Sequence, residues 1–196
     1  MNVEQRERYF DDIAAHKPAE AIAIEVLSDL GMGFNFTDVS NDSKYYNKGD
    51  AIMSKDGVDK FVDIKDDGCV WKTNNFFIET GGWDKIHHCK CKGWINSDYD
   101  FLAIVSQEKK NIWLLSMNRI KKFYNKFNIT GGRKVESQHW DKRKLGVTLP
   151  IEAAVKLNIV LAKIKYDYDD MLEYYFVKEY IGRRKLQNTN LTEILA

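Results

Sequence analysis

Two aspartates and a lysine are the residues of this sequence best suited to chemistry. Asp50 shortly precedes a hydrophobic segment in which Asp63, a spacer and Lys65 follow one another. Residues i and i+2 of a β-strand share a face, so we expect the Asp63 and Lys65 side chains to lie together. The carboxylate could bind a divalent metal, and the ammonium could stabilise a developing negative charge. Such groups suit phosphodiester hydrolysis, in which a cation relieves the repulsion between phosphate and nucleophile.

The expected cofactor is Mg²⁺, or Mn²⁺ in its place. Magnesium prefers oxygen ligands and keeps several waters, so a few carboxylates suffice. Asp50 and Asp63 can both bind it if their strands pair, and a neighbouring helix offers Glu20 or Glu25 as a third acid. Lys65 would act as a point charge against the phosphate or help to deprotonate water.

Helices and strands alternate around these residues. Hydrophobic periodicity predicts helices over 3–15, 18–30, 117–127, 151–164 and 167–181. It predicts strands over 34–39, 50–53, 61–65, 75–79, 99–105, 111–115 and 145–150. Lys55-Asp56-Gly57 is typical of a hairpin turn, and Gly81-Gly82 is expected to end the strand before it.

This order predicts an α/β fold with one central mixed β-sheet flanked by helices and a helical C-terminal part at 151–181. No repeat, low-complexity stretch or boundary divides the chain, so we expect residues 1–196 to form a single domain with a core at about 18–125. The segment 128–144 holds Gly131, Gly132 and several basic residues. We expect it to be a mobile basic loop.

The acidic pattern also resembles a known family. Asp50, twelve intervening residues and then Asp63-Ile64-Lys65 are similar to the signature of the PD-(D/E)XK nuclease superfamily. The helix with Glu20 resembles the first motif of its archaeal Holliday-junction resolvases. Three later segments resemble those of phage and bacterial members of the superfamily. They are Asn75-Phe76-Phe77-Ile78-Glu79, Lys92-Gly93-Trp94-Ile95 and Asp98-Tyr99-Asp100-Phe101.

The resemblance covers about residues 18–125 and implies a restriction-endonuclease-like fold with metal-dependent DNA endonuclease activity. It implies that Asp50 and Asp63 are catalytic metal ligands and that Lys65 is the catalytic lysine. It favours Glu20 as the third metal-binding acid, directly or through water, and places Glu79 at the same site in a supporting role.

Two departures from the family pattern stand at the centre of the motif. Gly49 occupies the position where the signature has proline, and Asp63 stands where glutamate is more usual. Taken by itself, an Asp-x-Lys strand is most often an exposed face with a surface ion pair. The interpretation therefore depends on the helix and the second strand as well as on this short motif.

Cations gather between residues 119 and 144, with aromatic residues among them. Such cations could neutralise DNA phosphates, and the aromatic rings could stack on unpaired bases. A solvated helix face with inward-pointing rings explains the pattern equally well. The residues we expect to contact DNA are Lys121, Lys122, Arg133, Lys134, Lys142 and Arg143.

His87, His88, Cys89 and Cys91 crowd four potential zinc ligands into five residues. Structural zinc usually draws its ligand pairs from separated segments, and no second pair follows here. A polar loop between strands is the simpler interpretation, with a zinc-stabilised interaction domain as an alternative.

Composition limits the kinds of partner and the cellular location that we expect. The 196 residues are 44% hydrophobic, enough for a real core, and the formal net charge of +1 means that any nucleic-acid surface must be local. Three cysteines form no disulfide framework, no apolar run is long enough to cross a bilayer, and the charged N-terminus lacks a signal peptide's apolar stretch. We therefore expect a cytoplasmic protein.

Two expectations concern partners. Cutting both strands of a duplex often takes two active sites, which favours a homodimer. The main alternative to an enzyme is a non-catalytic DNA- or protein-binding accessory protein of a phage or mobile element, built on the same fold.

Overall fold

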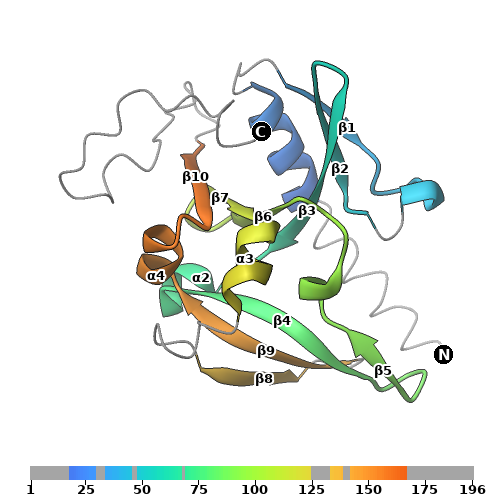
Figure 1. Ribbon diagram of the computed structural model, residues 1–196, viewed down its shortest axis with the longest axis vertical. Helices are drawn as coiled ribbons and strands as arrows, with labels where there is room; N and C mark the ends of the chain where they lie inside the picture. The colour runs from blue at the N-terminus through green and yellow to red at the C-terminus, as the bar shows by residue number, and fades with distance from the viewer. Residues whose placement is uncertain are drawn as a thin grey trace.

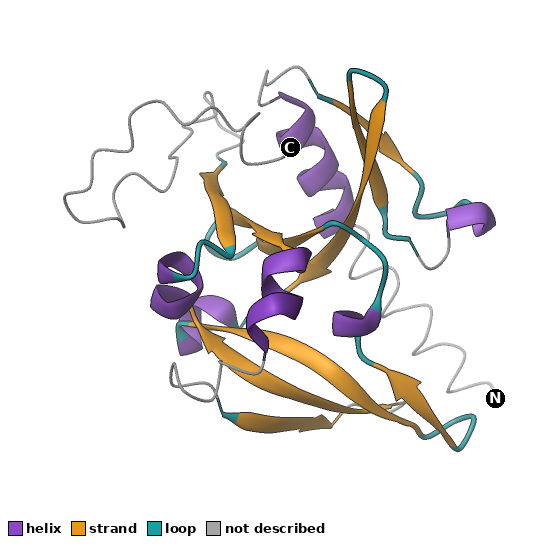
Figure 2. Cartoon of the chain, in the orientation of Figure 1, coloured by secondary structure: helices purple, strands orange, loops and turns teal. Residues whose placement is uncertain are grey.

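The structure, a computed structural model, describes residues 18–29, 34–45, 48–67, 69–124, 133–138 and 142–166. The helices predicted over 3–15 and 167–181 lie outside these residues. Strands dominate the described part of the chain, and short helices lie around them (Figure 2). None of the helices in this part is long and apolar enough to cross a membrane.

The first of two sheets is mixed and has the strand order β1-β2-β3-β6-β7-β10 (Figure 1). Its strands are β1 (Asn35–Asp38), β2 (Ala51–Lys55), β3 (Val58–Asp66), β6 (Phe101–Ser106), β7 (Asn111–Ser116) and β10 (Val160–Lys165). β3 and β6 are parallel, and the other neighbours are antiparallel. The predicted α/β class with a mixed central sheet is therefore confirmed.

A second, antiparallel sheet has the order β5-β4-β9-β8, so the expectation of one sheet is wrong. Its strands are β4 (Asn75–Asp84), β5 (Cys89–Lys92), β8 (Lys134–Gln138) and β9 (Lys142–Pro150). β4 runs through Gly81 and Gly82 instead of ending there, because both glycines pair with β9 and with β5. The segment 128–144, expected to be a loop, contains β8 and the start of β9.

The helices are short. They are α2 (Val70–Thr73), α3 (Met117–Phe123), α4 (Ile151–Lys156) and a helix over residues 18–29, with 3-10 turns η1 (Ser43–Tyr45) and η2 (Trp94–Asn96). The helix predicted over 151–164 is wrong beyond α4, because β10 follows and pairs with β7. A short apolar run such as Val160-Leu161-Ala162 has no periodicity that distinguishes a helix from a strand. Its conformation depends on whether a partner strand is available to pair with it.

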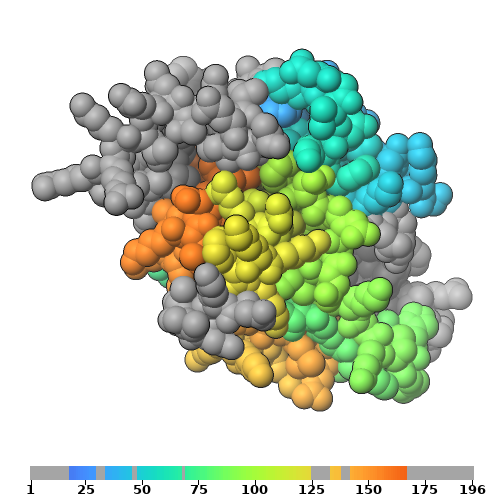
Figure 3. Space-filling view, in the orientation of Figure 1, coloured from blue at the N-terminus to red at the C-terminus, as the bar shows by residue number. Residues whose placement is uncertain are grey.

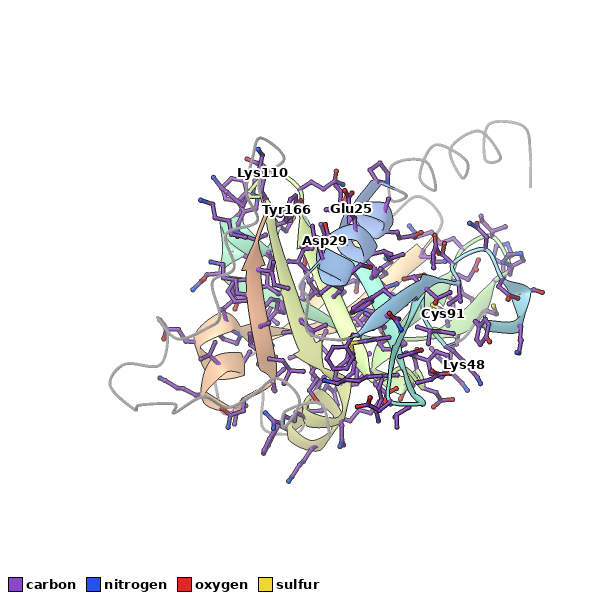
Figure 4. The ribbon with its side chains drawn as sticks, turned by 90° about the horizontal axis from the view of Figure 1, so that it is seen from above. Glu25, Asp29, Lys48, Cys91, Lys110 and Tyr166 are labelled. Atoms are coloured by element: carbon purple, nitrogen blue, oxygen red, sulfur yellow. The ribbon has the colours of Figure 1, made fainter. Side chains whose placement is uncertain are left out.

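The helix over residues 18–29, blue in Figure 1, covers one face of the first sheet. Figure 4 looks down on this helix and shows it lying across the strands. The residues it buries there are Ala19, Ala23, Val26 and Leu27, which pack in one cluster with Val62 and Ile64 of β3. This arrangement follows the helical spacing of the apolar residues, which places them on one side of the helix.

The second sheet covers the other face of the first. Leu102 and Ile104 of β6 pack there with Phe76 and Ile78 of β4. Successive residues of a strand point to opposite faces, so β3 turns Val62 and Ile64 towards the helix. It therefore turns Asp63 and Lys65 towards the second sheet.

Candidate metal site

The hairpin of β2 and β3 brings the two aspartates together. Ala51 pairs with Val62, so Asp50 lies beside Asp63 on the neighbouring strand. The Asp50 N–H donates to the Val62 carbonyl at 2.9 Å, and Asp50 Oδ2 accepts the Ile64 N–H at 2.7 Å. Asp56 and Gly57 turn this hairpin with φ angles of 51° and 80°, the left-handed geometry that the predicted turn requires.

Gly49 has a structural reason to stand before Asp50. Its φ of 122° is closed to proline, whose ring holds φ near −65°. A Cβ at this position would lie 2.6 Å from the Val62 carbonyl oxygen, closer than Cβ atoms come to other heavy atoms in proteins. The departure from the family signature therefore follows from how closely the chain passes β3 as it enters β2.

Asp63 and Lys65 form an ion pair, with 2.8 Å between Lys65 Nζ and Asp63 Oδ2. The Asp63 side chain is 11% exposed and the Lys65 side chain 43% exposed, so the pair opens to solvent on the lysine side. Burial, together with the negative charge of Asp50, raises the pKa of Asp63 to about 6, although Lys65 opposes this rise.

Lys65 remains protonated in these surroundings. Burial by itself lowers the pKa of its ammonium, but the charges of Asp63, Asp50 and Glu79 outweigh burial and raise the pKa above its ordinary value. The amine is therefore a fixed positive charge at neutral pH. The three carboxylates that act on it come from β3, from β4 and from the residue just before β2.

Glu79 brings the second sheet to the site. It lies on β4, where burial raises the pKa of its carboxyl and the positive charges of Lys144, Lys65 and Lys142 lower it. Lys144 Nζ on β9 is 3.8 Å from Glu79 Oε2. Lys144 belongs to the cationic segment between residues 119 and 144, and only the pairing of β4 with β9 reveals its place beside Glu79.

Tyr99 is a neighbour of Asp63 to which the sequence pattern assigned no role. It lies just before β6 and is 4% exposed. Its hydroxyl helps to lower the pKa of Asp63, while burial and the Asp63 charge raise the pKa of the phenol above its ordinary range. The contact is loose, since within the described residues that hydroxyl makes no hydrogen bond of ordinary length and angle. The segment Asp98-Tyr99-Asp100-Phe101 was the available signal.

Comparisons with protein-family models, curated proteins and solved structures found no match to this chain. Its function must therefore be inferred from the chemistry of these side chains.

The two aspartates fit a hard divalent cation. Asp50 Oδ2 is engaged by the Ile64 N–H, which leaves its Oδ1 able to bind a cation. Asp63 Oδ2 is buried and accepts no hydrogen bond of ordinary geometry within the described residues, although the Lys65 ammonium is near. Mg²⁺ is commonly held by one or two carboxylates, with waters and substrate oxygens completing its shell.

The described part of the chain places no third protein ligand beside them. Within the described ranges, no three Asp, Glu, His or Cys side chains gather closely enough to hold a metal ion. Glu20 is half-buried on the helix that covers the opposite face of the sheet from Asp63 and Lys65. Glu25, the other acid considered, is exposed and lies on the outward side of that helix (Figure 4). The role of Glu20 stays a prediction.

The expected DNA contacts are spread over two elements of the second sheet and α3. Lys142 lies near Glu79, and Arg143 makes an ion pair with Glu136. Lys121 on α3 donates to the Ser97 carbonyl at 2.5 Å. Lys122 follows it on α3, while Arg133 and Lys134 lie at the start of β8 and are exposed. Lys142 is thus the member of this set whose charge acts on Glu79.

The His/Cys segment forms the turn from β4 into β5. His87 Nδ1 lies 3.0 Å from Asp84 Oδ2, and hydrogen bonds from His87 lower the pKa of Asp84 to about 2. Cys89 is exposed and Cys91 half-buried on β5. This part of the chain thus combines a polar turn with an edge strand.

Proposed function

We propose that this chain is a Mg²⁺- or Mn²⁺-dependent endonuclease that hydrolyses DNA phosphodiester bonds on a restriction-endonuclease-like fold. The observation that carries the proposal is the Asp50–Asp63–Lys65 group. Two carboxylates on paired strands adjoin one ammonium, in a setting that is buried on one side and open on the other.

Each residue has a distinct part in the proposed reaction. Asp50 and Asp63 would hold the cation, which supplies positive charge to the phosphate and to its attacking water when bound. Lys65 would stabilise the negative charge that develops on the phosphate oxygens. Its raised pKa favours this role over that of a base that deprotonates water. Glu79 would orient Lys65 and Lys144 through their opposite charges.

A bound cation would offset the negative charge that the carboxylates bring to the site. Asp63 resists ionisation because it is buried beside Asp50, and its pKa of about 6 records that cost. A divalent cation would replace this proton and favour the ionised form of Asp63. Metal binding and proton release are therefore expected to be linked.

A non-catalytic DNA- or protein-binding module on the same fold is the second candidate. It is favoured by the absence, within the described ranges, of a cluster of three potential metal ligands. Such a module would bind its partner without need of the acidic group. The homodimer expected for a nuclease that cuts both strands also stays a prediction.

One experiment separates the two candidates. Calorimetric titration of the full chain with Mn²⁺ is followed by nicking assays on supercoiled and branched DNA with and without the metal. The nuclease is expected to bind Mn²⁺ and to nick DNA only when the metal is present. DNA binding with neither metal affinity nor nicking would instead identify the module.

A further inference from the structure

Two adjoining pockets lie beside β4. Both are lined by Thr80, the residue that follows Glu79. The larger, of about 540 Å³, lies over β8 and β9, and the smaller, of about 440 Å³, lies beside η2 and α3. Thr80 and Tyr124 line both. Both volumes fall within the roughly 300–1,000 Å³ typical of small-ligand sites. Figure 3 shows α3 in yellow with the segment around η2 in green beside it and β8 and β9 below.

A β-bulge in β4 separates Glu79 of the candidate metal site from Gly81, and its extra residue lines the pockets. β4 shifts its register against β9 between Glu79 and Gly81, which makes Thr80 the extra residue. Thr80 Oγ1 donates to the Leu145 carbonyl at 3.2 Å. Glu79 interacts with Lys65 and Lys144, while the next residue, Thr80, lines the pockets.

An aromatic ring and an aliphatic side chain contribute to the lining of these largely polar pockets. Tyr124 is half-buried and packs against the core cluster between the two sheets, while it also lines both pockets. Leu145 adds an apolar side chain that is 41% exposed to the larger pocket. An aromatic ring held by the core can stack on a planar base.

Charged and hydrogen-bonding groups accompany this surface. Lys134 lines the larger pocket and Lys121 the smaller one, so a cation is available in each. The acid of the larger pocket, Glu136, is engaged by Arg143. The Asn96 amide donates to the Gly93 carbonyl at 3.4 Å through one N–H, and its oxygen is a further acceptor for a base edge.

We propose that these pockets bind one unpaired nucleotide of a DNA substrate, with its base against Tyr124 and its phosphates at Lys121 and Lys134. This inference rests on the proposed function and narrows its substrate to DNA with an unpaired region, such as a single strand, flap or junction. A base stacked within an intact duplex enters a pocket only after it is unpaired and unstacked, at a cost of a few kcal/mol. Phosphates contact the cations in either form, so the ring is what discriminates.

Fluorescence anisotropy in the presence of EDTA tests the proposal without catalysis. The full chain is titrated against a labelled single-stranded oligonucleotide and against the duplex of the same length. We expect the single strand to bind at least about tenfold more tightly, and Tyr124→Ala to remove most of this preference. Tyr124→Phe keeps the ring and should bind within about threefold of wild type.

A second variant guards against misfolding, because Tyr124 also packs against the core. Lys134 is exposed, so Lys134→Glu should fold normally and weaken single-strand binding, with a smaller dependence on salt. Lys156→Ala on α4 is the control and should bind as wild type does. Equal affinity for duplex and single strand, or unchanged binding by both Tyr124→Ala and Lys134→Glu, would overturn the proposal.

The nicking assay distinguishes failure of this inference from failure of the enzymatic one. Metal-dependent nicking without a preference for single strands would show that the pockets take no part in substrate binding. The nuclease proposal would be unaffected. Single-strand binding that depends on Tyr124, with no nicking in the presence of any metal, would support the nucleotide pocket. The same result would contradict the nuclease proposal.

Discussion

Asp50 Oδ2 accepts the backbone N–H of Ile64 at 2.7 Å, so a side chain from the start of β2 is fixed against the middle of β3. Ile64 lies between Asp63 and Lys65, and its own side chain points into the core on the other face. The orientation of Asp50 therefore depends on the register of the hairpin. The three polar groups are held by the same backbone pairing that builds the sheet.

Substitution of Gly49 should disturb this register most. Gly49→Ala adds a Cβ 2.6 Å from the Val62 carbonyl oxygen at a φ of 122°, and we expect a loss of at least about 2 kcal/mol in the free energy of unfolding. Gly57→Ala is the matched control, because its φ is also positive but nothing lies within 4 Å, and it should lose about 1 kcal/mol. Urea denaturation measures both, and equal losses would contradict the close approach at Gly49.

Asp63 should make stability depend on pH. Its pKa is raised from 3.8 to about 6 in the folded chain, so the folded state binds this proton more tightly than the unfolded state does. The resulting stabilisation is complete below pH 3.8 and is lost as the pH rises through 6. Relative to Asp63→Asn, the wild type should lose up to about 3 kcal/mol across this window. Denaturation profiles from pH 4 to 8 test this, and parallel profiles would show that Asp63 titrates normally.

Divalent metal should reverse that loss at higher pH. At pH 8, above the pKa of Asp63, bound Mg²⁺ or Mn²⁺ would stabilise the folded chain by about 2.7 kcal/mol at a hundredfold excess over Kd. Asp50→Asn and Asp63→Asn should abolish this effect, whereas Asp56→Asn in the hairpin turn should keep it. Thermal denaturation with and without metal provides the measurement. An equal rise in Tm for all four proteins would place the metal elsewhere.

Lys65→Ala should abolish DNA cleavage while DNA binding and folding largely persist. Loss of one preorganised positive charge at a reacting phosphate typically costs at least about a hundredfold in rate. Lys156→Ala, which removes an exposed lysine of α4, controls for the change in net charge. Supercoiled-plasmid nicking and anisotropy are measured on the same preparations. Cleavage at the wild-type rate by Lys65→Ala would show that Lys65 has no role in the reaction.

Local patterns were sufficient for the elements nearest the acids. The two-residue period predicted that Asp63 and Lys65 share a face, and Asp56-Gly57 predicted the turn that aligns β2 with β3. The apolar spacing of 18–30 predicted the helix observed over 18–29, and the buried runs predicted β6 and β7. In each case the signal lies within a few residues of the structure that it predicts.

What the sequence alone determined, then, is the mixed central sheet, the hairpin and the adjacency of Asp63 and Lys65, because each follows from short-range geometry. Tertiary structure decided that β4 and β9 form a second sheet over the site, that 160–165 is a strand, that Lys144 lies beside Glu79 and that Tyr99 lies beside Asp63. Those features depend on pairing between segments as far apart as residues 79 and 146. Such pairing is set by which partner strands and apolar faces are available, and no local period encodes it.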